Sequence, residues 1–178
     1  MIFSETELKG AFVIDPELLK DDRGFFARIF CVNEFRNRGL VTKYVQCNIS
    51  FNLKKGTLRG MHYQAKPHEE VKLVQCIKGS IYDVIIDLRK DSPTFRKWIT
   101  VELTERNHRM FYIPEGFAHG FQTLEDNTEV FYQMAEFYSP EYAWGVRWDD
   151  PVFNISWPLN AVILSDRDKS YSLSINNA

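Results

Sequence analysis

The sequence predicts an all-β protein, either a sandwich or a barrel, from three observations. Aromatic residues make up 15% of the 178 residues, and large flat side chains pack well on pleated strands. Short apolar runs bounded by turn residues recur along the chain. No long stretch with a helical period interrupts them. We therefore expect strands throughout and only a few short helices.

The first half of the chain contains the best predicted helix, residues 33–38. Asn33 can cap the start of this helix, and Gly39 can end it. The apolar and aromatic runs around it are predicted to be strands, because turn residues separate them. These strands are residues 8–14, 25–30, 44–52 and 56–64.

The clearest hairpin in the sequence is residues 71–88. Two runs rich in Val and Ile flank a three-residue loop that carries Gly79, which is typical of paired antiparallel strands. The chain has no internal repeat or linker, so we expect residues 1–178 to form a single domain. Further strands are predicted at residues 95–103, 110–113, 117–121 and 129–138.

Charge and cysteine content restrict the partners and the compartment. A formal net charge of -2 gives no electrostatic reason to expect nucleic acid or an anionic membrane as a partner. The three cysteines are an odd number without CxxC spacing, which favours a reducing compartment over a disulfide or zinc framework. No basic leader and no apolar run of membrane-spanning length is present. We expect a cytoplasmic protein.

The stretch GTLRGMHYQ, residues 56–64, is the strongest candidate for a functional site. Arg59 and His62 are three residues apart, so regular strand alternation would place them on opposite faces. A bulge at Gly60 would bring both side chains inward. Arginine suits phosphate, and histidine is a base that titrates near neutrality. The alternative is a hairpin arm with an incidental histidine and a surface arginine.

The four histidines fall into two classes. His62 and His119 lie in apolar strand patterns that contain glycine. His68 and His108 lie in charged loops, where we expect them to be solvated. A histidine that is only part of the core remains the alternative for His119.

Three cations, Arg23, Arg59 and Lys72, lie within or beside predicted strands. A cation in such a place needs either solvent or a counter-anion. If the three converge, they suit a diphosphate. For Lys72, which follows Val71 directly, the alternative is a strand residue that faces water.

The segments HYQ and PEGFAH resemble the two halves of a cupin signature. Metal-binding cupins carry a second histidine where this chain has Gln64. A metal held by His62, Glu69 and His119 is therefore left only as an alternative, and we expect no metal.

A more specific resemblance extends over about residues 8 to 170. Many segments in one order are more specific than any single motif. Together they resemble the dTDP-4-dehydrorhamnose 3,5-epimerase family of nucleotide-sugar epimerases. The segments are DDRGFF, QCNIS, GTLRGMHYQ, VKLVQCIKGSIYDVIIDLRKDSPTFRKW, YIPEGFAHGFQTLEDNTEVFY and GVRWDDP.

This resemblance implies a jelly-roll, cupin-like β-sandwich that forms a homodimer and uses no cofactor. It implies epimerisation of a nucleoside-diphosphate 4-keto-6-deoxyhexose, for which dTDP is the expected carrier. His62 matches the base, and Asp168 matches the carboxylate that orients it. Tyr132 matches the acid on the opposite face of the sugar, and Lys72 matches the cation near the developing oxyanion.

The resemblance also implies a set of substrate-binding residues. Arginines match contacts to the diphosphate and sugar, amides match hydrogen-bond partners of the ligand, and one tyrosine matches an aromatic that stacks on the nucleobase. The complete set is Arg23, Gln46, Asn48, Arg59, His119, Tyr138 and Arg167.

Two departures from the family pattern fall near the ligand. Arg28 stands where the family commonly has a glutamate that helps to recognise the nucleotide, which leaves the nucleotide open. Ala143 and Trp144 replace residues that are usually polar or charged. The alternatives are a related epimerase that inverts one centre, a keto-isomerase, or a non-catalytic cupin that binds sugar nucleotides.

Overall fold

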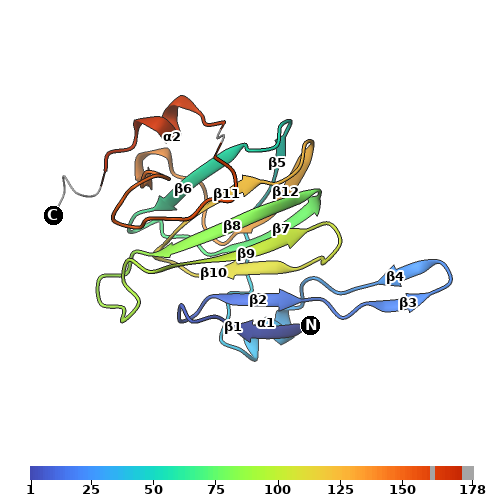
Figure 1. The fold of residues 1–178 in the computed structure, drawn as a ribbon. Coiled ribbons are helices and arrows are strands. Elements are labelled where there is room, and N and C mark those ends of the chain that lie inside the picture. The colour runs from blue at the N-terminus through green and yellow to red at the C-terminus, as the bar shows by residue number, and fades with distance from the viewer. Residues whose placement is uncertain (161–162, 174–178) are drawn as a thin grey trace.

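The computed structural model describes residues 1–160 and 163–173. Two antiparallel sheets face each other (Figure 1). One sheet has the strand order β1-β2-β10-β7-β12-β5, and the other has the order β13-β6-β11-β8-β9. This arrangement confirms the all-β sandwich that the sequence predicts.

The bounds of the elements follow the predicted runs closely in most places. Residues 110–113 are a strand with the predicted bounds, whereas the strand predicted for residues 25–30 ends at Phe26. Strands β1, β3 and β13 and the short helix α2 were not predicted. The elements are β1 (Ile2–Glu5), β2 (Phe12–Asp15), β3 (Leu19–Asp21), β4 (Gly24–Phe26), α1 (Val32–Arg36), β5 (Gln46–Asn52), β6 (Leu58–Gln64), β7 (Lys72–Lys78), β8 (Ser80–Asp87), β9 (Trp98–Thr104), β10 (Met110–Ile113), β11 (Phe117–Thr123), β12 (Thr128–Met134), the 3-10 turn Pro140–Tyr142, β13 (Ala143–Gly145) and α2 (Asp166–Ser170).

The hairpin predicted for residues 71–88 is wrong. Strand β7 pairs with β10 and β12, whereas β8 pairs with β9 and β11 in the opposite sheet. Both strands are interior strands of their own sheets, which explains why each is a nearly continuous apolar run. The chain crosses between the sheets at Gly79, where φ is +75° and an added Cβ would lie 2.6 Å from Thr128 Oγ1.

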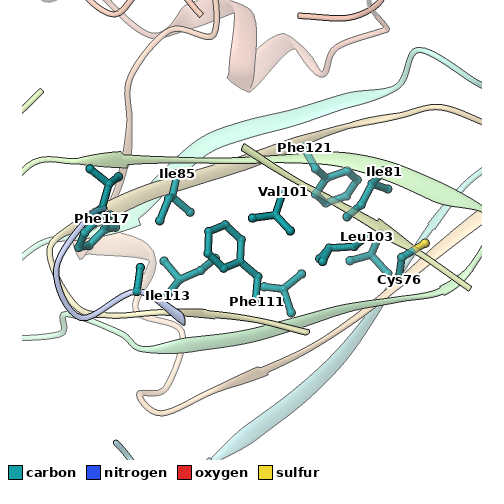
Figure 2. Packing of buried hydrophobic residues seen from close by; sticks show 13 residues of the cluster. Cys76, Ile81, Ile85, Val101, Leu103, Phe111, Ile113, Phe117 and Phe121 are labelled. Carbon is teal, nitrogen blue, oxygen red and sulfur yellow. The ribbon is translucent and has the colours of Figure 1, made fainter. Parts of the chain in front are cut away.

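A core of buried apolar side chains fills part of the space between the sheets (Figure 2). Phe111 and Val74 enter it from the first sheet, and Ile85 and Phe121 enter it from the second. Burial of such apolar side chains is the main stabilising term for the sandwich. Phe121 also borders the polar cavity described below, so the core ends where the candidate site begins.

The hairpin formed by β3 and β4 extends away from both sheets (Figure 1). Its apolar side chains are exposed, with Leu19 at 68% and Phe26 at 67%.

Among the helices that the structure describes, none has the length and apolar character of a membrane span.

Asp87, at the end of β8, gives the fold a dependence on acid pH. Its buried carboxylate accepts hydrogen bonds from Arg89, Ser92 and Thr94. Burial raises its pKa, but these hydrogen bonds outweigh burial and lower the pKa to about 2. Because the folded pKa lies below the unfolded value, the stabilisation is present above about pH 4 and is lost towards pH 2.

We therefore expect Asp87→Asn to lower the free energy of unfolding by about 2 kcal/mol at pH 7. Urea unfolding of both proteins at pH 7 and pH 3 measures this difference. The difference in the free energy of unfolding between the two proteins should be smaller at pH 3 than at pH 7. An equal difference at both pH values would contradict the lowered pKa of Asp87.

Candidate active site

A cavity of about 180 Å³ lies between the two sheets, beside the apolar core. Strands of both sheets contribute to it. Its lining residues are Ser50, Arg59, His62, Lys72, His119, Phe121 and Tyr132.

A bulge in β6 turns Arg59 and His62 into the same cavity. His62 is opposite His119 on β11, Arg59 is opposite Phe121, and the register shifts between the two pairs. At Gly60, between them, φ is +136° and an added Cβ would lie 2.5 Å from the Cα atom of Gly120. The backbones approach so closely that no other residue fits at this position. The predicted bulge at Gly60 is confirmed.

His62 is paired with a carboxylate from the far end of the chain. Its Nε2 atom lies 2.6 Å from Oδ1 of Asp168, on helix α2, which lies over β6 (Figure 1). Ser165 caps this helix by accepting a hydrogen bond from the backbone N–H of Asp168, which fixes the position of the carboxylate. A buried carboxylate beside one ring nitrogen orients the imidazole, so that the other nitrogen is available as a base.

The pKa of Asp168 is consistent with a charged partner for His62. Asp168 is only 3% exposed, and this burial raises its pKa. The hydrogen bond and charge of His62, with smaller contributions from Gly60 and Ser165, nevertheless bring the pKa below its usual value. The carboxylate is therefore ionised at neutral pH, and it can stabilise an imidazolium.

Tyr132 and Lys72 enter the cavity from the opposite sheet. In the register of β12 with β7, Tyr132 is opposite Val74 and Met134 is opposite Lys72, so the two side chains share one face. Burial, and then the negative charge of Glu70, raise the pKa of Tyr132, whereas Arg59 lowers it. Tyr132 is therefore a neutral phenol that can donate a proton.

His119 belongs to a second histidine–carboxylate pair that the sequence analysis missed. Its Nε2 atom lies 2.6 Å from Oδ1 of Asp83, and Asp83 is completely buried in β8. The signal was present, since a carboxylate inside a buried apolar run requires a polar or charged partner. His119 is therefore a buried histidine with a satisfied ring nitrogen, the alternative that the sequence left open, and it also lines the cavity.

Most of the predicted binding residues lie in or beside the cavity. Arg59 also donates from Nε to Asn52 Oδ1 at 2.7 Å, which fixes its guanidinium. Gln46 and Asn48 share the cavity face of β5 with Ser50, because they alternate with outward-facing residues.

Tyr138 and Arg167 form a group next to the His62–Asp168 pair. Arg167 Nη1 donates to the Tyr138 hydroxyl at 3.2 Å, and Arg167 directly precedes Asp168 on α2. The backbone N–H of Tyr138 donates to Oε1 of Gln46. Tyr138 is 49% exposed, so it is accessible to a ligand.

Arg23 does not join the other residues within one chain. It lies on the extending β3–β4 hairpin, where it pairs with Asp21 at 2.6 Å and its side chain is 90% exposed. Arg28, which stands at the position of the family glutamate, is also exposed and lies 3.5 Å from Glu34.

The proposed ligands of the alternative metal site, His62, Glu69 and His119, do not lie around one cavity. Gln64 is buried, and its amide bonds to the backbone of His68, Phe137 and Ser139, so it has a structural role. Glu69 lines a separate cleft of about 880 Å³. Across residues 1–160 and 163–173, no group of three potential ligands could hold a metal ion.

The cavity has an imidazole that can act as a base on one sheet and a phenol that can act as an acid on the other, and Arg59 and Lys72 line the same cavity. Such a cavity suits proton removal and return on opposite sides of a bound molecule. The family model described as dTDP-4-dehydrorhamnose 3,5-epimerase matches residues 5–174. The chain belongs to this family.

Curated members of the epimerase family align over almost the whole chain. The dTDP-4-dehydrorhamnose 3,5-epimerase of Methanothermobacter thermautotrophicus is 45% identical, over 95% of this chain and 92% of its own length. That of Shigella flexneri is 43% identical, over 92% of this chain and 91% of its own.

Solved structures of the epimerase family share the fold. The epimerase of Bacillus anthracis, with TDP and PPi bound, gives a TM-score of 0.94 at 43% identity and covers 97% of this chain and 98% of its own. A 3'-monoepimerase of Streptomyces bikiniensis, in complex with dTDP-quinovose, gives a TM-score of 0.90 at 29% identity, over 97% of this chain and 89% of its own. The jelly-roll, cupin-like sandwich that the sequence resemblance implies is thereby confirmed.

Proposed function

We propose that this protein epimerises a dTDP-linked 4-keto-6-deoxyhexose at C3 and C5, as a step in the formation of a deoxysugar. The observation that carries the proposal is the arrangement of His62 and Tyr132, which enter one cavity from opposite sheets. The named activity of the relatives from M. thermautotrophicus and S. flexneri supports the substrate. An acid and a base on opposite sides of a sugar ring are what inversion of a carbon next to a ketone requires.

In the proposed mechanism, His62 removes the proton from the carbon next to the 4-ketone. Asp168 orients the imidazole and stabilises the imidazolium that forms. The electron pair moves onto the ketone oxygen, where the enolate is stabilised by the Lys72 ammonium, with His119 nearby. Tyr132 then donates a proton to the opposite face of the carbon, which inverts its configuration.

Binding of the nucleoside diphosphate is proposed to use the cations and the aromatic group around the cavity. Arg59 and Arg167 suit the diphosphate, because guanidinium groups bind phosphate oxygens in pairs. Tyr138 has an exposed ring that suits stacking on the nucleobase. Gln46 and Asn48 offer amide groups to the ligand.

A second candidate function is inversion of one centre only. The S. bikiniensis relative, a 3'-monoepimerase, has the same fold, so the fold does not distinguish one inversion from two. Both functions require His62 and Tyr132. They differ in whether C5 exchanges its hydrogen.

We also propose that the protein acts as a homodimer. The outward side chains of β5 are apolar and exposed, with Ile49 at 62% and Phe51 at 50%, where a solvated sheet face would be polar. The apolar β3–β4 hairpin would extend onto a second copy and carry Arg23 towards its ligand. Light scattering should give twice the mass of one chain, whereas the mass of one chain would contradict the dimer.

Two further predictions from the sequence are retained in this proposal. Residues 1–178 are proposed to form a single domain, because strands of both sheets share one core.

A reducing, cytoplasmic location is proposed because Cys31, Cys47 and Cys76 are free thiols.

The substrate is tested by incubating the purified protein with dTDP-4-keto-6-deoxyglucose and analysing the product by proton NMR. Proton coupling constants that show inverted configuration at both C3 and C5 would support the proposal. Inversion at C3 alone would support the monoepimerase function. Unchanged sugar, together with tight binding of dTDP, would overturn both in favour of a non-catalytic binding protein.

A further inference from the structure

Lys72 is paired with a carboxylate that stands behind it. The Nζ atom of Lys72 lies 2.7 Å from Oε1 of Glu70, and the side chains are buried, with exposed fractions of 10% and 7%. Of the described residues, Lys72 lines the site cavity and Glu70 does not. The ammonium group that lines the cavity is therefore held by a carboxylate from outside the cavity lining.

The cost of burying Glu70 indicates a role beyond stability. Its second oxygen, Oε2, is buried and has no hydrogen-bond partner among the described residues. Removing a carboxylate from water is expensive, and a buried ion pair is often no more stabilising than apolar residues of the same size. A functional demand on Lys72 explains why a charged pair is present.

We propose that Glu70 is a positioning residue, which holds the Lys72 ammonium in an ion pair so that its N–H donors face the ketone oxygen of the bound sugar. This inference rests on the proposed epimerase function. The ion pair with Glu70 anchors the Lys72 ammonium, which carries three N–H donors. These donors can be directed at the oxygen that becomes negative when the enolate forms.

The pair also favours the transition state over the bound substrate. The charges of Lys72 and Glu70 balance, so their attraction for a neutral ketone is weak. As negative charge develops on the ketone oxygen, it gains the attraction of an ammonium that is already in place. An interaction that is stronger in the transition state than in the ground state accelerates the chemical step.

The charge of Glu70 acts on a second member of the site. After burial, it is the next cause of the raised pKa of Tyr132, and Arg59 opposes it. The same carboxylate thus helps to keep the phenol protonated and available as the acid.

The first test is Glu70→Gln, which keeps the shape of the side chain and removes its charge. We expect kcat to fall by about tenfold to a hundredfold, while KM changes by less than about threefold, because the loss falls on the transition state. Glu70→Asp, which keeps the charge, should recover part of the loss. The matched control is Glu69→Gln, a neighbouring carboxylate that faces the separate cleft and should retain wild-type kcat.

A double-mutant cycle separates positioning from a general loss of stability. If Glu70 acts mainly through Lys72, adding Glu70→Gln to a Lys72→Met protein should change kcat/KM by less than about threefold, measured per folded enzyme. If Glu70→Gln lowers kcat/KM by the same factor in the wild-type and the Lys72→Met proteins, the proposal is overturned.

A third measurement does not depend on the substrate. Acetylation of Lys72, followed by mass spectrometry of peptides, should be about fivefold faster in Glu70→Gln, because the amine is released from the ion pair. Lys54, whose side chain is 63% exposed, is the internal reference. Equal acetylation of Lys72 in both proteins would overturn the proposal. An inactive wild-type protein would instead overturn the epimerase function, and the acetylation result would still decide whether Glu70 holds Lys72.

Discussion

His62→Asn should lower deuterium incorporation at C3 and C5 of dTDP-4-keto-6-deoxyglucose by about 10²- to 10⁴-fold, which is the usual contribution of a positioned acid or base. Asparagine can still hydrogen-bond to Asp168, but it cannot accept a proton from the sugar. The measurement is proton NMR in deuterium oxide, in which each carbon reports its own exchange. The proton signals of C3 and C5 should persist with the variant at times when the wild-type enzyme has already replaced both hydrogens by deuterium.

The matched control for His62 is His68→Asn. His68 lies 3.7 Å from Glu136, stacks near Tyr142 and lies outside the lining of the cavity. This variant should exchange at the wild-type rate. Exchange at the wild-type rate in His62→Asn would contradict the assignment of His62 as the base.

Tyr132→Phe should separate exchange from inversion. Without the phenol on the opposite sheet, the enolate formed by His62 takes its proton back from the same side. His62 is 38% exposed, so it exchanges this proton with solvent. The variant should therefore incorporate deuterium at a rate within about tenfold of the wild-type enzyme, while inverted product falls by about 10²- to 10³-fold.

Proton NMR measures both quantities for Tyr132→Phe, because loss of a signal reports exchange and the couplings report configuration. Tyr82→Phe is the matched control, since Tyr82 packs against Trp157 away from the cavity. Equal losses of exchange and of inversion in Tyr132→Phe would show that the phenol takes part in proton removal.

The strands and the bulge at Gly60 could be predicted from the sequence because both depend on local physics. A run such as residues 110–113 has the composition of a buried strand in any environment, and glycine between bulky residues marks a close backbone approach. The inward turn of both Arg59 and His62 depended on the bulge at Gly60, since their spacing in a regular strand would place them on opposite faces. Local patterns were sufficient for these features.

The pairing of distant residues was not accessible from local pattern. Residues 71–88 satisfy every local condition for a hairpin, and yet their strands belong to different sheets, because strand partners are chosen across the whole chain. The contact of His62 with Asp168 joins residues 106 positions apart, and only the family resemblance suggested it. Asp83 was missed for the same reason, since nothing local connects it to His119.

The position of Arg23 illustrates a further limit. The sequence marks it as a cation that suits phosphate, but it lies on an exposed hairpin away from the cavity of its own chain. Its predicted contact with the diphosphate therefore depends on the proposed second copy. A single sequence contains no signal of which chain completes a site.

The most direct test of a base and an acid on opposite sides of one cavity is the wild-type reaction with dTDP-4-keto-6-deoxyglucose in deuterium oxide, followed by NMR. The proposed mechanism predicts that every product molecule with inverted configuration at C3 and C5 carries solvent deuterium at both carbons. Inverted product that retains its original hydrogen at either carbon would contradict transfer between His62 and Tyr132.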